Sequence, residues 1–436
     1  MIVRLPFVKF IAAILALTLV AICGGCAVGS SYGERTKAAS TIPDSETDPE
    51  IRSALELIER IPDSPSGYVQ LAITHIQRAR KSGDFSLNAK AESAINKALE
   101  IAPKDEPARK LKGSLLLTYH RFTEALDYAT QLNRDVPNDA LVYGILADAN
   151  LELGNYAEAI SAAQTMVDLK PNSSSYARVA HIRSLHGDHD GSIEMYKVAA
   201  RTTDPKDKEA QSWCLVQLGD EYFKYGSFVE AEKIYDEALS ILPDYYLGVA
   251  AKGKVRAAQN DFEGAEKSLS SLLDRIPNVD SAIILGNIYT KKGDSDRARS
   301  QYDLAELMES KIGINTDQKR LAMMWADQDR KLPEALEIAT REFAVRKDIY
   351  TADTLAWAQF KSGKFAAAKE SSTQAMRTKG SDARILFHAG MIEKALGNRK
   401  EAIKLLESAI KLNPAFDVIQ ADNAKRTLAE LKRGAA

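Results

Sequence analysis

Prolines and small residues recur along the chain at nearly constant intervals. Six prolines stand at positions 103, 137, 171, 205, 243 and 277, so that four of the five gaps are 34 residues and one is 38. Nine small residues, from Ala125 to Ala402, recur at gaps of 33 to 39 residues. A period near 34 over nine copies predicts a solenoid of stacked structural repeats, and no other feature of the sequence constrains the fold as strongly.

Within each period the apolar residues predict a pair of helices. In residues 212–245 one helix face carries Leu215, Leu218, Gly219 and Tyr222. The inward face of a second helix carries Ala231, Tyr235 and Ala238. Gly226 follows the first helix and Pro243 ends the second. Since a large side chain would force the helices apart where they cross, we expect Gly219 to touch the second helix near Ala231.

This unit resembles the tetratricopeptide repeat, whose pattern is Leu-Gly-x-x-Tyr, then Ala-x-x-x-aromatic, then Pro. Ten copies follow one another over roughly 66–105, 106–139, 140–172, 173–206, 212–245, 246–278, 279–312, 316–348, 349–382 and 383–416. A lone helix is expected at 49–61, and a polar capping helix at 417–432. The resemblance implies an all-α fold, a right-handed superhelix of about ten helix-turn-helix repeats over residues 48–436.

The N-terminus resembles a bacterial lipoprotein signal peptide. Arg4 and Lys9 precede an uninterrupted apolar stretch, and Gly24 and Gly25 precede Cys26. We expect residues 1–25 to be removed, Cys26 to carry the lipid (palmitate among its chains), and residues 26–47 to form a flexible tether. We expect the protein to be anchored to the periplasmic face of a membrane. In a Gram-negative cell this would be the outer membrane. An uncleaved signal anchor and plain secretion are the alternatives.

Charge and motifs exclude several function classes. The 58 Lys and Arg balance 60 Asp and Glu, which argues against a nucleic-acid partner. No nucleotide-binding, metalloprotease or serine-hydrolase motif is present, so we expect no enzyme activity and no cofactor. Three histidines fall in one stretch, at His181, His186 and His189. They suggest a metal site, but Gly187 corresponds to Gly154 one repeat earlier, which favours an inter-helix loop and no bound metal.

In tetratricopeptide superhelices, four positions of each first helix line the concave groove. In copy nine these positions hold Tyr350, Asp353, Trp357 and Phe360, and in copy ten Arg384, Phe387, Met391 and Lys394. Copy eight places Asp317, Arg320, Met324 and Asp327 there, and copy five contributes Trp213 and Phe223. Aromatic residues and Arg anchor protein interfaces, so copies nine, ten and five are the predicted partner-binding groove. Alternatively, tight curvature packs these side chains against the neighbouring first helix, and His388 is expected to be packed or hydrogen-bonded.

The function implied is a non-catalytic scaffold of the cell envelope that binds other proteins or peptides in this groove. The membrane would be a second partner, reached through the lipid anchor. Two other hypotheses remain open: a superhelix that holds a glycan or lipid, and a signal-anchored adaptor.

Overall fold

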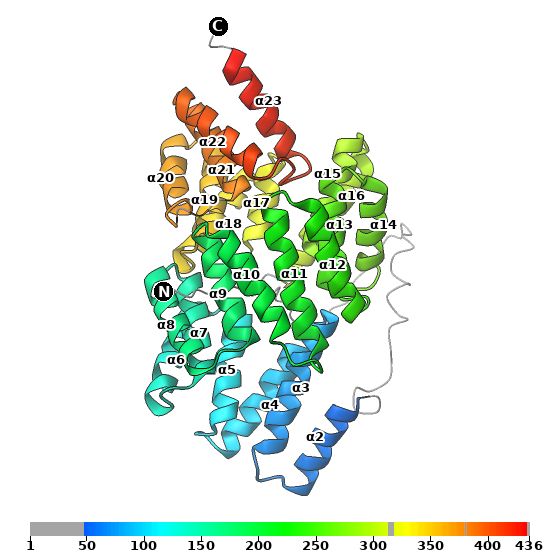
Figure 1. Cartoon of the computed structure of the whole chain (residues 1–436), viewed down its shortest axis with the longest axis vertical. Helices are drawn as coiled ribbons and strands as arrows, with labels where there is room; N and C mark the ends of the chain where they lie inside the picture. The colour runs from blue at the N-terminus through cyan, green and yellow to red at the C-terminus, as the bar shows by residue number, and fades with distance from the viewer. Residues whose placement is uncertain (1–47, 313–317, 379, 381, 434–436) are drawn as a thin grey trace, which may run out of the picture. The chain divides into compact units, whose positions relative to one another are not determined.

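The computed structural model describes residues 48–312, 318–378, 380 and 382–433, and these residues form 22 α-helices without a strand (Figure 1). The first nine helices are α2 (Pro49–Arg60), α3 (Ser66–Ser82), α4 (Leu87–Ile101), α5 (Glu106–Thr118), α6 (Phe122–Asp135), α7 (Ala140–Glu152), α8 (Tyr156–Leu169), α9 (Ser173–Leu185) and α10 (His189–Arg201). The next seven are α11 (Lys208–Lys224), α12 (Phe228–Ile241), α13 (Tyr246–Ala258), α14 (Phe262–Leu273), α15 (Val279–Lys292), α16 (Ser295–Ile312) and α17 (Lys319–Asp327). The last six are α18 (Leu332–Val345), α19 (Ile349–Lys361), α20 (Phe365–Ala375), α21 (Ala383–Ala395), α22 (Arg399–Leu412) and α23 (Gln420–Arg433).

The helices confirm the predicted all-α solenoid. They form ten successive pairs, from α3 with α4 to α21 with α22, with α2 before the first pair and α23 after the last. The described part of the chain divides within α5 into a small compact unit, residues 48–80 and 84–112, and a large one, residues 81–83 and 113–433. No helix in the described ranges is long and apolar enough to cross a membrane. The predicted signal peptide, Cys26 and the predicted tether lie outside the described residues.

The small unit packs α2 to α4 and the start of α5 around a short apolar core. Asp48 caps α2, since its carboxylate accepts hydrogen bonds from the backbone N–H groups of Glu50 and Ile51. The same carboxylate pairs with Arg78 of α3 at 3.3 Å, which ties the ends of the two helices together. Buried Val69, Ala98 and Ala108 form the centre of the core.

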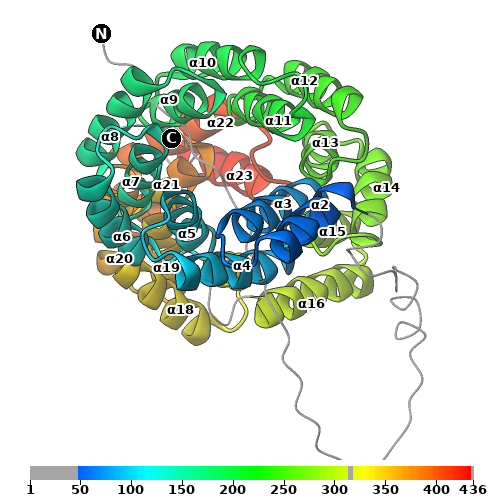
Figure 2. The same cartoon turned by 90° about the horizontal axis from the view of Figure 1, so that it is seen from below.

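In the large unit each pair packs on the next, and the first helix of each pair takes the inner position. Figure 2 shows α7, α9, α11 and α13 inside, with α8, α10, α12 and α14 around them. The structure therefore places the first helices on the inner side, as the repeat register implies.

A glycine on the first helix makes room for a large side chain of the second. The ring of Tyr235 lies directly against the Cα atom of Gly219, where a Cβ would collide with it. The same arrangement, with the partner 16 positions later, joins Gly253 to Leu269, Gly286 to Tyr302 and Gly390 to Leu406. The predicted crossing at Gly219 is confirmed, but its contact is Tyr235, one helical turn beyond Ala231.

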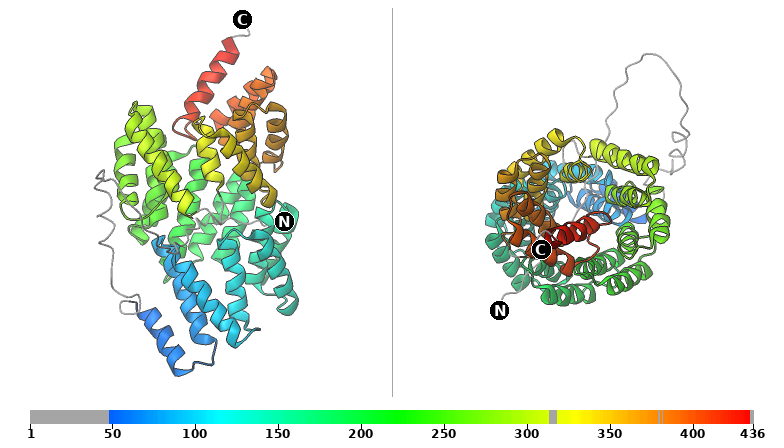
Figure 3. Two further views of the ribbon diagram at one scale, coloured as in Figure 1. Left: turned by 180° about the vertical axis from the view of Figure 1, so that it is seen from behind. Right: turned by 90° about the horizontal axis from the view of Figure 1, so that it is seen from above.

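The later repeats of the large unit return to the earlier ones. The backbone N–H of Ile349, in copy nine, donates a hydrogen bond to the Tyr156 hydroxyl of copy three at 3.0 Å. One buried cluster joins Ile182 and Val179 of α9 to Ile349 of α19 and Ile385 of α21. In Figure 3 the gold and orange helices of copies eight to ten stand next to the teal helices of copies three and four. We call copies three to five the first-turn repeats and copies eight to ten the second-turn repeats.

The contacts between these two sets recur with a spacing of five copies. The inter-helix loop of copy three, at Gly154, meets Lys347 at the end of copy eight. The carbonyl of Leu185, in copy four, lies against Gly380 of copy nine. The Phe223 carbonyl, in copy five, accepts a 2.8 Å hydrogen bond from the Asn413 side chain of copy ten. One superhelical turn therefore takes about five repeats.

Candidate partner-binding surface

Trp357 and Phe387, the centre of the predicted groove, are buried. Their exposed fractions are 2% and 1%, and their ring centroids lie 5.6 Å apart across α19 and α21. The Trp357 indole donates a 2.9 Å hydrogen bond to a carboxylate oxygen of Asp327 on α17. The prediction of an open groove at these two positions is therefore wrong, because α19 contacts its neighbouring first helices α17 and α21, and the Phe416 ring also packs in this cluster. Their part in partner binding stays a prediction.

Asp353 and His388 form a buried pair beside them. His388 Nδ1 lies 2.9 Å from a carboxylate oxygen of Asp353, and the imidazole stacks on Trp357 with ring centroids 4.1 Å apart. The exposed fractions are 4% for Asp353 and 1% for His388, so neither side chain faces the open groove. The prediction that His388 is packed or hydrogen-bonded is confirmed, and the structure shows both.

The other predicted residues of copies nine and ten are half-buried. They are Tyr350, Phe360, Arg384, Met391 and Lys394. Phe360 stacks on Trp357 at 4.9 Å between ring centroids. Burial raises the pKa of the Tyr350 hydroxyl well above its ordinary value, and the carboxylate of Asp382 adds to this, so Tyr350 stays neutral. These five side chains keep part of their surface exposed to solvent, and we call them the accessible stripe.

Arg384 is one of the two cations of the accessible stripe, with Lys394, and it is surrounded by acidic groups. Its guanidinium lies 3.5 Å from a carboxylate oxygen of Asp417, and 42% of its side chain is exposed. Desolvation lowers the pKa of Arg384, but the carboxylates of Asp417 and Asp327 outweigh it and raise the pKa overall. Burial raises the pKa of Asp327, Arg384 opposes the shift and Asp417 reinforces it. One cation therefore serves two carboxylates that repel each other.

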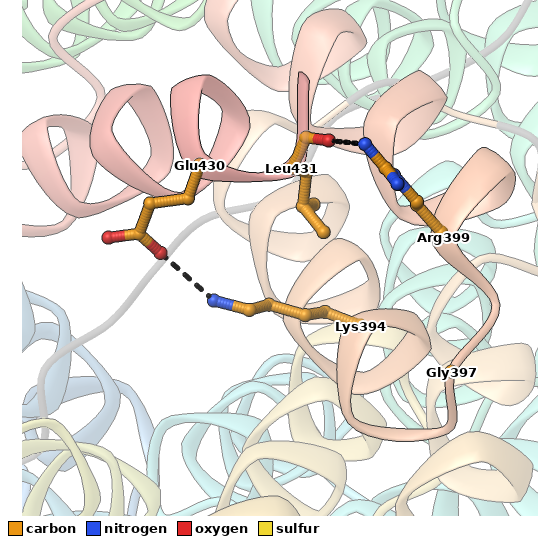
Figure 4. A pocket seen from close by; sticks show the side chains of 5 residues that line it. All are labelled: Lys394, Gly397, Arg399, Glu430 and Leu431. Carbon is orange, nitrogen blue, oxygen red and sulfur yellow. Dashed lines mark hydrogen bonds and ion pairs between the residues drawn. The ribbon is translucent and has the colours of Figure 1, made fainter. Parts of the chain in front are cut away.

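Lys394, at the far end of α21, lines a small cavity beside the C-terminal helix. Figure 4 shows Lys394 paired with Glu430 at 3.3 Å, and Arg399 donating to the backbone carbonyl of Leu431. The cavity measures about 270 Å³ and Gly397 completes its wall. Its volume is slightly below the roughly 300–1,000 Å³ that is usual for small-molecule sites.

The second predicted patch, Trp213 and Phe223 of copy five, is also buried. The exposed fractions are 9% and 6%. The ammonium of Lys254 lies 4.0 Å from the centre of the Phe223 ring and 3.4 Å from a carboxylate oxygen of Asp220. Here too, contacts between neighbouring helices bury residues that the repeat register places in the groove. Partner binding at this patch stays a prediction.

Residues 186–188 of the histidine stretch form the predicted loop between α9 and α10, whereas His181 lies within α9 and His189 begins α10. Gly187 has a φ of +80°, and the carboxylate of Asp188 caps α10 through the backbone N–H of Gly191 at 3.1 Å. His186 Nδ1 contacts the carbonyl of Ile182 at 2.8 Å. Across the described ranges, no three His, Cys, Asp or Glu side chains are grouped to hold a metal ion. Cys214, the one cysteine in those ranges, is 2% exposed on α11.

Two sets of residues in the large unit escaped the sequence analysis. Glu152 and Arg346 form a buried ion pair between copies three and eight, with 3% and 9% of their side chains exposed. Asn413, Phe416 and Asp417 lie in the linker before α23 and contact α11 and α21. Both sets join segments that are far apart in sequence. No periodic signal marks them, because their contacts depend on the pitch of the superhelix.

Comparisons with known proteins agree with the repeat assignment. A tetratricopeptide repeat model matches residues 111–174 and 250–311, and a second one matches residues 383–416. No curated protein matches the chain significantly. The solved structure of a human IFIT1 dimer with PPP-AAAA is similar, with 16% identity, a TM-score of 0.44, and coverage of 83% of this chain and 85% of that one. A similarity at this level does not bear on ligands or partners. The chain contains tetratricopeptide repeats, built into an all-α solenoid.

Proposed function

We propose that this chain is a non-catalytic scaffold, anchored by a lipid in a bacterial envelope, which binds segments of other proteins on the inner side of its superhelix. The observation that carries the proposal is the series of ten successive helix pairs, three stretches of which match tetratricopeptide repeats. Proteins of this fold are typically non-catalytic and bind proteins or peptides. A stacked array also supplies a long continuous surface for such segments.

The accessible stripe supports a binding role for copies nine and ten. It combines aromatic and methionine side chains, which provide apolar contact area, with Arg384 and Lys394, which orient an acidic segment. Its half-buried side chains need little reordering to accept a partner, which lowers the entropic cost of binding.

A photo-crosslinking amino acid placed at Met391 tests this surface. In cells of the source organism it should trap a protein partner, whereas the same group at Val229 should not. Val229 is the matched control because it is 72% exposed on the outer helix α12. Equal trapping at both positions, or trapping at Val229 alone, would place partner binding elsewhere on the solenoid.

Anchoring at Cys26 is tested separately. Cys26→Ser should abolish incorporation of a labelled fatty acid and release the protein from membranes, or leave the uncleaved precursor. Cys23→Ser is the control and should leave both properties unchanged. If the Cys26→Ser protein still incorporates the label and fractionates as the wild type does, Cys26 is not the lipid acceptor.

A further inference from the structure

Seven residues between α22 and α23 connect repeats that are distant in sequence. This C-terminal linker, residues 413–419, begins at Asn413, which is 1% exposed and bonded to the Phe223 carbonyl of α11. The carbonyl of Val418 accepts a 3.2 Å hydrogen bond from Lys291 at the end of α15. Directly after the linker, the side chain of Gln420 donates to Asp327 of α17 at 3.0 Å. The linker and the start of α23 therefore contact the C-terminal ends of three first helices, α11, α15 and α17.

Two residues in the middle of the linker, Phe416 and Asp417, contact two residues of the predicted groove. The ring of Phe416 lies 5.7 Å from that of Phe387, between centroids, in a cluster that also holds Trp357. The next residue, Asp417, pairs with Arg384. Phe387 and Arg384 are both groove positions of copy ten, so an aromatic side chain followed by an acidic one already fills this part of the groove from within the chain.

The contacts of Phe416 and Asp417 in the groove are weaker than the contacts between the first-turn and second-turn repeats. Arg346 of copy eight pairs with Glu152 of copy three, with only 9% and 3% of their side chains exposed. The Arg384–Asp417 pair is longer, at 3.5 Å, and its arginine is 42% exposed, so water screens it more strongly. Asp417 also sits close enough to Asp327 to raise the pKa of that carboxyl, which shows that the two acids repel each other. Asn413 and α23 fix the two ends of the linker. Residues 415–419 can therefore move out of the groove only as a loop, with both ends in place.

We propose that the C-terminal linker is an internal occupant of the groove, and that the segment bound there in trans carries an aromatic residue followed directly by an acidic one. This inference rests on the proposed function and deepens it, since it names the chemistry of the partner. The aromatic ring of the partner takes the place of Phe416 against Phe387 and Trp357. Its carboxylate takes the place of Asp417 on Arg384. The linker and the partner therefore exclude each other.

A fluorescent peptide with the sequence of Pro414 to Gln420, PAFDVIQ, is the probe. Full-length protein carrying Phe416→Ala and Asp417→Asn should bind it about tenfold more tightly than the wild type, equivalent to about 1.4 kcal/mol. Asparagine at 417 retains the cap on α23, where Asp417 now accepts hydrogen bonds from the backbone N–H groups of Ile419 and Gln420 at 2.8 and 2.9 Å. Adding Arg384→Met to this variant should remove its preference for PAFDVIQ over PAFNVIQ, and the peptide PAADVIQ should bind at least tenfold more weakly.

Circular dichroism melting accompanies each titration. If the double variant loses its C-terminal repeats, the single variant Asp417→Asn replaces it and should still bind the peptide more tightly than the wild type. A folded variant that binds PAFDVIQ no better than the wild type, or binds PAADVIQ equally well, overturns the inference. The test uses no cellular partner, so its failure is distinct from failure of the proposed function, which would appear as absence of trapping at Met391.

Discussion

The inter-helix loops of copies three and nine have the same backbone and opposite surroundings. Gly154 and Gly363 each follow a first helix, with φ values of +79° and +75°. A Cβ on Gly154 would lie 2.6 Å from the carbonyl oxygen of Lys347 and would collide with the guanidinium of Arg377, whereas Gly363 has nothing within 4 Å. Local sequence therefore sets the loop conformation, while the superhelical pitch decides whether the loop is covered.

Copies five and ten repeat this contrast. A Cβ built on Gly226 would lie 3.2 Å from the Pro414 ring of copy ten. A Cβ built on Gly397, at the corresponding position of copy ten, would have nothing within 4 Å. The pattern follows from the five-copy spacing, because each first-turn repeat is covered by the repeat that lies five copies later in the chain. The second-turn repeats have none in the described part of the chain. A mutation at equivalent positions should thus have unequal effects on the two sets.

The largest expected effect concerns the inner and outer aromatic residues of copy nine. Trp357→Ala should lower the free energy of unfolding by about 3–5 kcal/mol, since it removes a fully buried Trp and leaves a cavity. Phe365→Ala is the control: its side chain is 38% exposed at the open loop, so a loss of about 0.5 kcal/mol is expected. Urea unfolding of both variants measures the difference. Similar small losses for the two would mean that Trp357 faces an open groove after all.

The sequence predicts the repeats better than their environment. The glycines and the Ala-x-x-x-aromatic spacing report contacts within one helix pair, and the ten pairs are found at the expected places. A helix also lies at each predicted end position, but the last one begins at Gln420 and not at residue 417. Burial of Trp357, Phe387 and Trp213 depends on how closely successive first helices approach, and the register alone leaves this open. The pairing of Glu152 with Arg346 depends on the pitch over five repeats, to which each repeat contributes a small rotation that no short motif encodes.

A smaller effect separates the covered and open glycines. Gly154→Ala and Gly363→Ala share the strain of an alanine at positive φ, roughly 1–2 kcal/mol. Gly154→Ala additionally forces the Lys347 carbonyl away, because that oxygen belongs to the backbone, and overpacking of this kind costs about 1–3 kcal/mol. Thermal melts should therefore rank Gly154→Ala as the less stable variant. Equal melting temperatures would contradict the close approach of copies three and eight.

The smallest expected effect is a loss of stability at low pH, caused by protonation of Asp348 beside the contact between copies three and eight. Burial alone would raise the pKa of Asp348, but Arg346 and Lys319 together with hydrogen bonds from Thr351 bring it below the ordinary value. A carboxylate with a lowered pKa stabilises the fold at pH values above about 3.9, its unfolded value, and this stability is lost as the pH falls through the folded pKa. Stability measured between pH 7 and 3 should fall at the acid end in the wild type, and less steeply in Asp348→Asn. An identical acid limb in both would show that Asp348 does not contribute.

The packing of the second-turn repeats on the first is tested most directly by a double-mutant cycle on Glu152 and Arg346, which are 194 positions apart in sequence and form a buried ion pair. Removing one partner of a buried pair leaves the other charge without it and costs about 3–5 kcal/mol. Glu152→Gln, Arg346→Met and the double variant are compared by urea unfolding. The structure predicts a coupling energy of at least about 1 kcal/mol, whereas effects that add within about 0.5 kcal/mol would show that the two side chains do not meet.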